Sequence, residues 1–375
     1  MSYRNKKQKI DVFLALLILA MAGFGLIMIS SASVVLSYEK FGHNYHYLTK
    51  QFEYLLVGII GMIFMAMFDY RHLKKNALWF LIGSLGLLLL VLIPGVGSNL
   101  KGASRWVHIG PIFFQPSEFA KLGFVIYLAA WLDKKGILIK SFKAGFAPFF
   151  ALVGVLIFLI LKQPDMGTAI VFITTAVTVF FIAGADISQL VVGTTSVAVA
   201  LSALIVSSPY RLNRLKVFLS PESHSVLGIG YHAYQALLAI GSGGILGLGF
   251  GQSKQKYLYL PEPFSDSIFA ISVEELGFVR AAFIIVAFLL LAWRGFNVAK
   301  RAQDDFGKYL AAGITSWFVF QAFLNISAML GVVPLTGVPL PFISAGGSSL
   351  VISLIAVGIL LNVSKQSRSA NYERI

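Results

Sequence analysis

Residues 261–277 read Pro261-Glu262-Pro263-Phe264-Ser265-Asp266-Ser267-Ile268-Phe269-Ala270-Ile271-Ser272-Val273-Glu274-Glu275-Leu276-Gly277. This stretch leads directly into the apolar segment Ala281 to Trp293, so four carboxylates stand where a membrane-spanning helix is predicted to begin. The whole chain of 375 residues has only 16 acidic residues. Because ionisable groups at such a place are costly and usually functional, we expect a membrane protein with a functional site at the start of this helix.

The composition is that of a polytopic membrane protein. Hydrophobic residues make up 57% of the chain and charged residues 12%, against about 25% charged residues in soluble domains, and the mean hydropathy is +0.81. A membrane span needs about 17 to 25 apolar residues. We therefore predict an all-α fold with ten transmembrane helices: Asp11 to Leu36, Phe52 to Phe68, Ala77 to Ile93, Ser117 to Leu132, Gly145 to Leu161, Met166 to Gly184, Ile187 to Ser207, Ile268 to Trp293, Tyr309 to Leu330 and Ser348 to Val363.

We predict one integral membrane domain over residues 1–375, because neither a linker rich in Pro, Gly or Ser nor a repeat of fixed period divides the chain. Residues 1–10 and 364–375 form short polar tails. The largest connection, residues 208–267, precedes the eighth span. Within it, residues 230–240 have the pattern of an amphipathic helix and the glycines of residues 241–251 break regular structure. An interfacial helix is therefore expected to cover this face as a lid.

The distribution of lysine and arginine predicts the orientation, since cytoplasmic segments retain positive charge. An even number of spans places both termini on one side, and most of the 30 lysines and arginines fall in segments on that side. Both termini are therefore predicted to be cytoplasmic and residues 208–267 extracytoplasmic. This bias accounts for most of the net charge of +14, so we expect anionic lipid, and not nucleic acid, as the partner of these charges.

Several kinds of chemistry are disfavoured by what the sequence lacks. The chain has no cysteine, which excludes disulfides and thiolate metal sites. Its six histidines do not have the spacing of zinc ligands. No Gly-rich loop ends in Lys-Ser or Lys-Thr, so ATP-driven work is not supported.

Asp266 is the leading candidate for chemistry. It follows Pro263 by three positions, so we place it in the first turn of the eighth span, where the helix dipole stabilises a carboxylate by roughly 0.3 to 1 kcal/mol. Asp266 could instead be only a cap, or a solvated residue at the membrane edge. An aspartate beside so apolar a run favours the functional interpretation.

Glu274 and Glu275 continue the polar stripe deeper into the same span. A buried ion pair of these carboxylates with Arg280 or Lys121, which would order the helices without chemistry, is slightly favoured over a functional role.

A second polar group opens the fourth span. Residues 116–118 have the composition of a helix start, and Glu118 and Lys121 are three positions apart and therefore share a helix face. This pair could be purely structural. However, Lys121 together with Arg105, which precedes the span, would also suit a diphosphate group in a cavity on the outer side.

Three further segments are left open between structure and function. Arg211, Arg214 and Lys216, at the start of the large connection, are explained as well by contact with lipid phosphate. Residues 163–168 and 339–349 have turn-forming sequences at helix entries, for which tight packing is at least as good an explanation as substrate contact.

Eight of these motifs, taken in order, resemble the SEDS family of FtsW, RodA and SpoVE, and the resemblance covers nearly the whole chain. They are Ser30-Ser31-Ala32-Ser33, residues 102–106, Gln115-Pro116-Ser117-Glu118 with Lys121, Gln163-Pro164-Asp165-Met166-Gly167-Thr168, residues 241–251, Leu260-Pro261-Glu262 with Asp266, Glu274-Glu275-Leu276-Gly277, and residues 341–349. Residues 339–349 and 358–364 are more similar to FtsW and SpoVE than to RodA.

The resemblance implies a peptidoglycan glycosyltransferase with ten spans that polymerises lipid II on the outer face of the cytoplasmic membrane. It also implies a class B penicillin-binding protein and other divisome membrane proteins as partners, and septal synthesis as the more fitting role. As hypotheses, Asp266 is the general base, Arg105, Lys121 and Arg214 hold the diphosphate, and Glu118 orients Lys121. Substrate contacts are further expected at Glu262, Glu275 and Ser348. Mg²⁺ or Mn²⁺ could assist at the diphosphate, but the sequence gives no ligand set.

Two alternatives remain at this stage. A flippase or another transporter of lipid-linked substrates would also use intramembrane ionisable residues, but would carry them near the midplane and expose them alternately to both faces. A scaffold that only recruits a synthase would tolerate substitutions in the acidic stretch.

Overall fold

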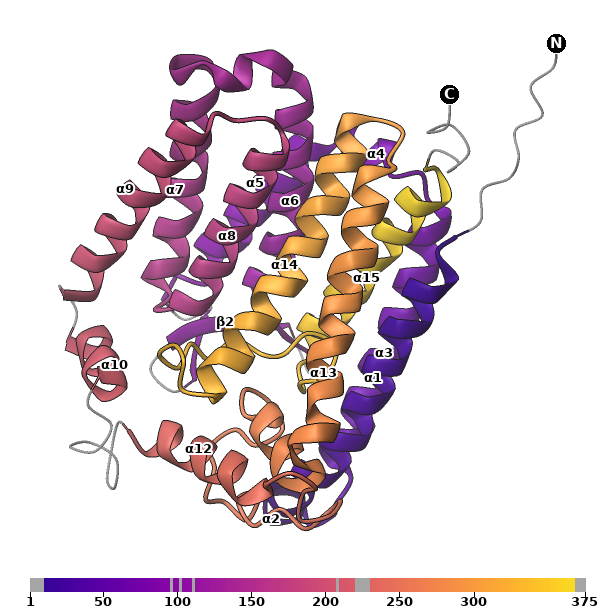
Figure 1. Cartoon of the computed structure of the whole chain (residues 1–375), viewed down its shortest axis with the longest axis vertical. Coiled ribbons are helices and arrows are strands. Elements are labelled where there is room, and N and C mark those ends of the chain that lie inside the picture. The colour runs from indigo at the N-terminus through magenta and orange to yellow at the C-terminus, as the bar shows by residue number, and fades with distance from the viewer. Residues whose placement is uncertain are drawn as a thin grey trace.

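The computed structural model describes residues 10–94, 97–100, 103–109, 112–206, 209–219 and 230–367. Of the predicted tails at residues 1–10 and 364–375, residues 1–9 and 368–375 lie outside the described residues, as do residues 208 and 220–229 of the large connection and Gly102. The last helix runs to Lys365, two residues into the predicted C-terminal tail. In the described part, long helices run side by side as one bundle (Figure 1).

A helix occupies each of the ten predicted spans. These helices are α1 (Val12–Ala32), α3 (His46–Met67), α5 (Ala77–Leu90), α6 (Pro116–Lys135), α7 (Ala147–Lys162), α8 (Met166–Ile182), α9 (Ile187–Val206), α13 (Ile268–Lys300), α14 (Asp305–Met329) and α15 (Gly347–Lys365). By length and composition, 7 helices of the described part can cross a membrane, and α5 and α8 are shorter apolar helices. The chain is therefore a multi-pass membrane protein built from helices.

Short elements connect the long helices. They are α2 (Val34–Phe41), α4 (Arg71–Lys75), α10 (Pro209–Leu219), α12 (Tyr231–Gly243), a 3-10 turn (Gly136–Lys140) and a π turn (Phe142–Phe146). The predicted amphipathic helix at residues 230–240 is confirmed as α12. The segment between α5 and α6, for which no regular structure is predicted, forms an antiparallel sheet in the order β1 (Gly97–Leu100), β2 (Ala103–Ile109), β3 (Ile112–Phe114), with Val107 paired to both Gly97 and Phe114.

The two ends of the bundle differ. The described N-terminal and C-terminal residues and α4 lie at one end, which we call the terminal end, and α2, α10, α12 and β2 lie at the other, the loop end (Figure 1). Contacts fix the terminal end, because the Asp11 backbone N–H donates to Ser364 Oγ at 3.1 Å and the Tyr70 hydroxyl donates to Asp304 Oδ2 at 2.8 Å. The start of α1 and the end of α15 therefore lie at the same end of the bundle, which agrees with an even number of spans.

The core is centred on α14, which packs against α6, α8 and α13. The large side chains Trp317 and Phe318 of α14 are almost fully buried. The α3 and α15 helices approach closely because Gly358 faces the α3 backbone, where a Cβ atom would lie 2.3 Å from the Met62 carbonyl oxygen. Such close approach of backbones through small residues is typical of helix packing in membranes.

The eighth span is broken at Gly277, which has φ 83° and ψ 167°, a conformation essentially restricted to glycine. The connection that follows α12 pairs with the chain at this break: the N–H groups of Leu248 and Gly249 donate to the carbonyls of Glu274 and Glu275, both at 3.0 Å, and the Phe278 N–H donates to the Gly244 carbonyl at 2.9 Å. Residues 268–276 are thus a short helix at the loop end, and the long part of α13 begins after the break.

We expect Gly277→Ala to lower the free energy of unfolding by about 3 kcal/mol, because a side chain strains this backbone conformation and its Cβ would lie 2.3 Å from the Gly247 nitrogen. Thermal unfolding of the purified protein in detergent measures the effect. Gly154→Ala in α7, where nothing lies within 4 Å of the added Cβ, is the matched control and should change stability by less than about 1 kcal/mol. Equal stability of the two variants would contradict the break at Gly277.

Candidate functional site

Asp266 lies in the turn that precedes α13 and is half-buried. The helix begins at Ile268 with Ser267 as its N-cap, so the placement of Asp266 in the first helical turn is wrong by two positions. The cause is a tight turn at Glu262, whose φ is +50° and whose carbonyl accepts hydrogen bonds from the N–H groups of Ser265 and Ser267, both at 3.2 Å. The turn delays the start of the helix and leaves Asp266 at the loop end.

The Asp266 turn is held by the segment that connects α14 and α15, residues 331–346. The Asn325 Nδ2 group donates to the backbone carbonyls of both Asp266 and Val338 at 2.8 Å. The Asp266 Oδ2 atom lies next to Gly337, where an added Cβ would be 3.4 Å away. The two irregular segments are thus joined through one amide side chain of α14, and the Asp266 carboxylate faces residues 331–346.

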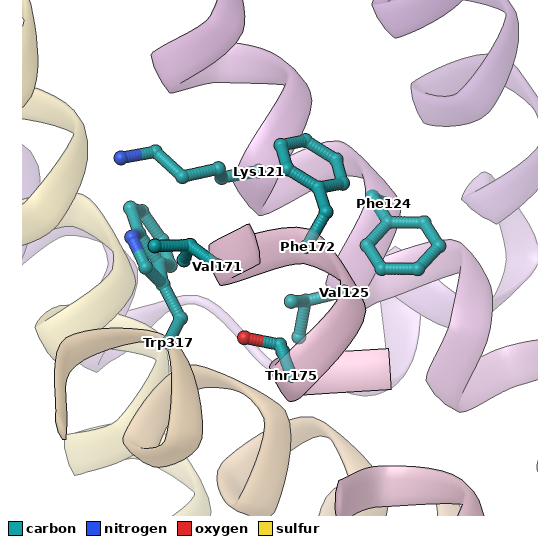
Figure 2. Close-up of a pocket in the computed structure, with 7 residues that line it drawn as sticks. All are labelled: Lys121, Phe124, Val125, Val171, Phe172, Thr175 and Trp317. Carbon is teal, nitrogen blue, oxygen red and sulfur yellow. The ribbon is translucent and has the colours of Figure 1, made fainter. Parts of the chain in front are cut away.

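Glu118 and Lys121 form the ion pair expected from their spacing. The Lys121 Nζ atom lies 2.9 Å from Glu118 Oε1, and the side chains are only 3% and 1% exposed, respectively. Lys121 also donates to Gln321 Oε1 at 2.7 Å and lies 4.9 Å from the Trp317 ring centroid. Figure 2 shows the Lys121 side chain extending past the Trp317 indole. The predicted pair is confirmed, and it is sealed inside the bundle.

The space beside this pair, between α6, α8 and α14, is too small to admit a water molecule. Its lining is mostly apolar: Lys121, Phe124, Val125, Val171, Phe172, Thr175 and Trp317 (Figure 2). It is a packing gap in the core.

One face of α14 connects the buried pair to the Asp266 turn. Gln321 accepts from Lys121 and donates through Nε2 to the Pro339 carbonyl at 2.9 Å. Asn325 lies one helical turn further on and holds Asp266 and Val338. Neither amide was identified from the sequence, although two amides four positions apart in an apolar span are a signal for a shared polar face.

Arg105 on β2 is anchored to the turn before α8. Its guanidinium donates to the carbonyls of Gln163, at 3.1 Å, and Pro164, and its Nη1 atom lies 3.9 Å from Asp165 Oδ2. This turn is adjacent to residues 331–346, because a Cβ on Gly167 would lie 2.2 Å from Val338 Cγ2. The Arg105 side chain is 22% exposed, so its guanidinium is partly accessible.

Arg214 and Ser348 also border residues 331–346. Arg214 on α10 donates through Nη1 to the Leu335 carbonyl at 2.9 Å. The Ser348 hydroxyl accepts from the Gln115 N–H at 3.2 Å and joins the starts of α15 and α6. The structure therefore brings seven of the eight predicted residues to one region of the loop end: Arg105, Glu118, Lys121, Arg214, Glu262, Asp266 and Ser348.

Glu275 belongs to a separate cluster, and its predicted pairing with Arg280 or Lys121 is wrong. Its Oε1 atom lies 3.1 Å from Lys256 Nζ and accepts from the Ser31 hydroxyl of α1 at 2.6 Å, while Arg280 donates to the Leu246 carbonyl. The break at Gly277 is the cause, since it separates Arg280 from the short helix that carries Glu275. Lys256 is 5% exposed and Glu275 is 0% exposed.

Glu274 stabilises the same connection by a different contact. Its carboxylate accepts from the Ser253 hydroxyl and from the Lys254 N–H at 3.0 Å. The two neighbouring glutamates therefore hold residues 253–256 against the short helix that follows Asp266. They act on the site through the position of that helix.

The lid helix α12 reaches the start of α13 through His232. The Ser267 hydroxyl donates to the Pro261 carbonyl at 2.8 Å, so its oxygen must accept from His232 Nε2 at 2.7 Å. This contact places α12 against the N-cap residue next to Asp266.

The described residues contain no group of three or more His, Cys, Asp or Glu side chains that could hold a metal ion.

Known proteins resemble the chain along nearly its whole length. Residues 11–369 match the family FTSW_RODA_SPOVE, described as cell cycle protein. The chain is 40% identical over 365 residues to stage V sporulation protein E of Bacillus subtilis, covering 97% of this chain and 99% of that protein. It is 42% identical over 355 residues to the probable peptidoglycan glycosyltransferase FtsW of Trichlorobacter lovleyi, covering 94% and 93%.

Solved structures share the fold. A chain from the work "Structural coordination of polymerization and crosslinking by a peptidoglycan synthase complex" superposes with a TM-score of 0.79 at 28% identity, covering 95% of this chain and 97% of that chain. The rod shape determining protein RodA of Thermus thermophilus gives a TM-score of 0.71 at 27% identity, with coverage of 96% and 98%.

We expect Lys256→Met to lower the free energy of unfolding by about 3 to 5 kcal/mol, because it leaves the Glu275 carboxylate buried without its partner. The double variant Lys256→Met, Glu275→Gln removes both charges and should recover much of this loss. Thermal unfolding of the purified proteins gives both values. A Lys256→Met variant as stable as the wild type would show that the pair does not fix this connection. The same would follow if the double variant lost as much free energy of unfolding as the two single variants lose together.

Proposed function

Since the chain belongs to the FtsW/RodA/SpoVE family of cell cycle proteins, we propose that it is a peptidoglycan glycosyltransferase that polymerises lipid II into glycan strands. The proposal rests on the half-buried Asp266 carboxylate at the loop end, which lies beside residues 331–346. Arg105 and Arg214 lie next to the same segment. The type of reaction, glycosyl transfer in peptidoglycan synthesis, is inferred from the names of the relatives.

The proposed transfer needs a base and a site for a departing anion. The acceptor sugar hydroxyl attacks the anomeric carbon of the donor sugar, the bond from that carbon to the diphosphate oxygen breaks, and the hydroxyl proton moves to Asp266. Positive charge aimed at the departing diphosphate lowers the barrier. Arg105 suits this task, because a guanidinium has five N–H donors and contacts to two carbonyls leave donors for the diphosphate.

In this arrangement Lys121 does not contact the diphosphate directly. Its ammonium group is 3% exposed and is held by Glu118 and Gln321, so direct contact with a diphosphate would require the pair to open. The structure favours a positioning role, in which the pair fixes Gln321 and thereby residues 331–346. Arg214 is better placed for direct contact, since it comes from α10 and reaches this segment from outside the core.

The loop end is proposed to face the outside of the cytoplasmic membrane, with both termini in the cytoplasm. Lysine and arginine support this orientation, since α4, the connection between α6 and α7 and the end of α13 carry many of them at the terminal end. We further propose a class B penicillin-binding protein and other divisome membrane proteins as partners, and the division septum as the place of work. The FtsW names of the relatives and the peptidoglycan synthase complex among the solved structures support these assignments.

The transport alternative is less well supported by the geometry. Asp266, Arg105 and Arg214 all lie at one end of the bundle. The buried Glu118–Lys121 pair is held by Gln321 and Trp317. A site that works from one face is what polymerisation on that face requires, whereas alternating access requires a site near the midplane.

We expect Asp266→Asn to lower the rate of lipid II polymerisation by about 100-fold or more, the usual contribution of a general base, without lowering the unfolding temperature, because the amide has nearly the same shape as the carboxylate. The rate is measured with purified lipid II, with the protein alone and with its class B penicillin-binding partner. Asp186→Asn, at an exposed position, is the control and should keep the full rate.

Two outcomes would contradict the proposal. Near-normal glycan strands from folded Asp266→Asn would remove the carboxylate from the chemistry. A wild-type protein that makes no strands with or without its partner, but moves labelled lipid II across proteoliposome membranes, would favour transport.

A further inference from the structure

The terminal end carries a polar cavity that takes no part in the proposed reaction. It has a volume of about 470 Å³ and lies between α4, the start of α5 and the end of α6. Its lining combines cations, one acid, two aromatic rings and two apolar side chains: Lys74, Lys75, Leu78, Tyr127, Ala130, Trp131, Asp133 and Lys134. Its size is in the range of small-molecule sites.

The charges in this cavity are unbalanced. Lys74 forms an ion pair with Asp133, which joins α4 to α6. Lys75 and Lys134 are exposed, and within the described part of the chain neither forms an ion pair. Two ammonium groups are thus left at the rim of the cavity, where an anion would neutralise them.

Two aromatic side chains of α6 form one wall of the cavity. Tyr127 and Trp131 are one helical turn apart on α6 and are both half-buried. The Trp131 ring lies 6.4 Å from the Phe149 ring, and Lys135 Nζ lies 5.5 Å from the Trp131 centroid. Tryptophan and tyrosine are enriched at the boundary between hydrocarbon and headgroups. The two rings are therefore of the kind found beside lipid headgroups.

The cavity is also open toward the bilayer. Leu78, which lines it, is 56% exposed, and the adjacent Trp79 is 71% exposed. In a membrane protein such apolar side chains face lipid chains. A ligand that places a negative headgroup between lysines and apolar chains along α5 satisfies both parts of the site.

We infer that this cavity binds the headgroup of an anionic phospholipid, such as phosphatidylglycerol, from the membrane leaflet at the terminal end. Basic pockets between transmembrane helices on the cytoplasmic side are a recognised type of lipid site, and the lysines would hold the phosphate as point charges. The inference is independent of the proposed reaction. It assigns a ligand to some of the lysines at the terminal end.

The test compares three purified proteins in neutral detergent by native mass spectrometry, titrated with phosphatidylglycerol and, separately, with phosphatidylcholine. They are the wild type, the double variant Lys75→Ala, Lys134→Ala, and the control Lys143→Ala, Lys300→Ala, which removes two exposed lysines of the same end away from the cavity. We expect the wild type and the control to prefer phosphatidylglycerol. The cavity variant should bind its tightest phosphatidylglycerol about 30-fold more weakly, with an unchanged unfolding temperature.

Two results would overturn the inference. Equal affinity of all three proteins for phosphatidylglycerol, or no preference of the wild type over phosphatidylcholine, would show that the cavity does not select an anionic lipid. If inorganic phosphate displaced phosphatidylglycerol from the wild type at similar concentration, the site would belong to a soluble anion.

Discussion

Backbone without regular structure cannot lie at membrane depth unless its N–H and C=O groups find partners within the protein, and the loop end of this bundle depends on that constraint. Residues 261–267 and 331–346 are the irregular segments concerned. Buried amide side chains serve them: Asn325 donates to both segments, Gln321 donates to Pro339, and Gln51 of α3 donates to the Ser344 carbonyl and accepts from the Gly346 N–H.

This arrangement explains why the candidate site is formed by residues that are distant in the sequence. α14 is almost entirely buried, and the amides on it join the Asp266 turn to residues 331–346. The buried Glu118–Lys121 pair fixes Gln321 in turn. The proposed role of Asp266 as a base requires a carboxylate held in one geometry, and the amides on α14 hold its turn through backbone carbonyls.

The sequence predicted those features that depend on local patterns. Apolar length placed a helix at each of the ten predicted spans, and 7 helices of the described part are long and apolar enough to cross a membrane. The three-residue spacing of Glu118 and Lys121 predicted their ion pair. Asp266 was identified from its charge, but its turn depends on the conformation of Glu262. The partner of Glu275 was missed, because Lys256 is brought to it by backbone hydrogen bonds between residues 244–249 and the chain around the break at Gly277. Asn325 was missed because an uncharged amide gives a weak signal and its partner lies 59 positions away.

The most direct test of the role of α14 is the rate of lipid II polymerisation by Asn325→Leu, measured beside its unfolding temperature and beside Asn325→Gln as a variant that keeps the amide. We expect a rate at least about tenfold lower for Asn325→Leu, because a small misplacement of a reacting group has a large effect on rate. Partial activity is expected for Asn325→Gln. A folded Asn325→Leu protein that polymerises lipid II at the wild-type rate would contradict the claim that this amide positions Asp266.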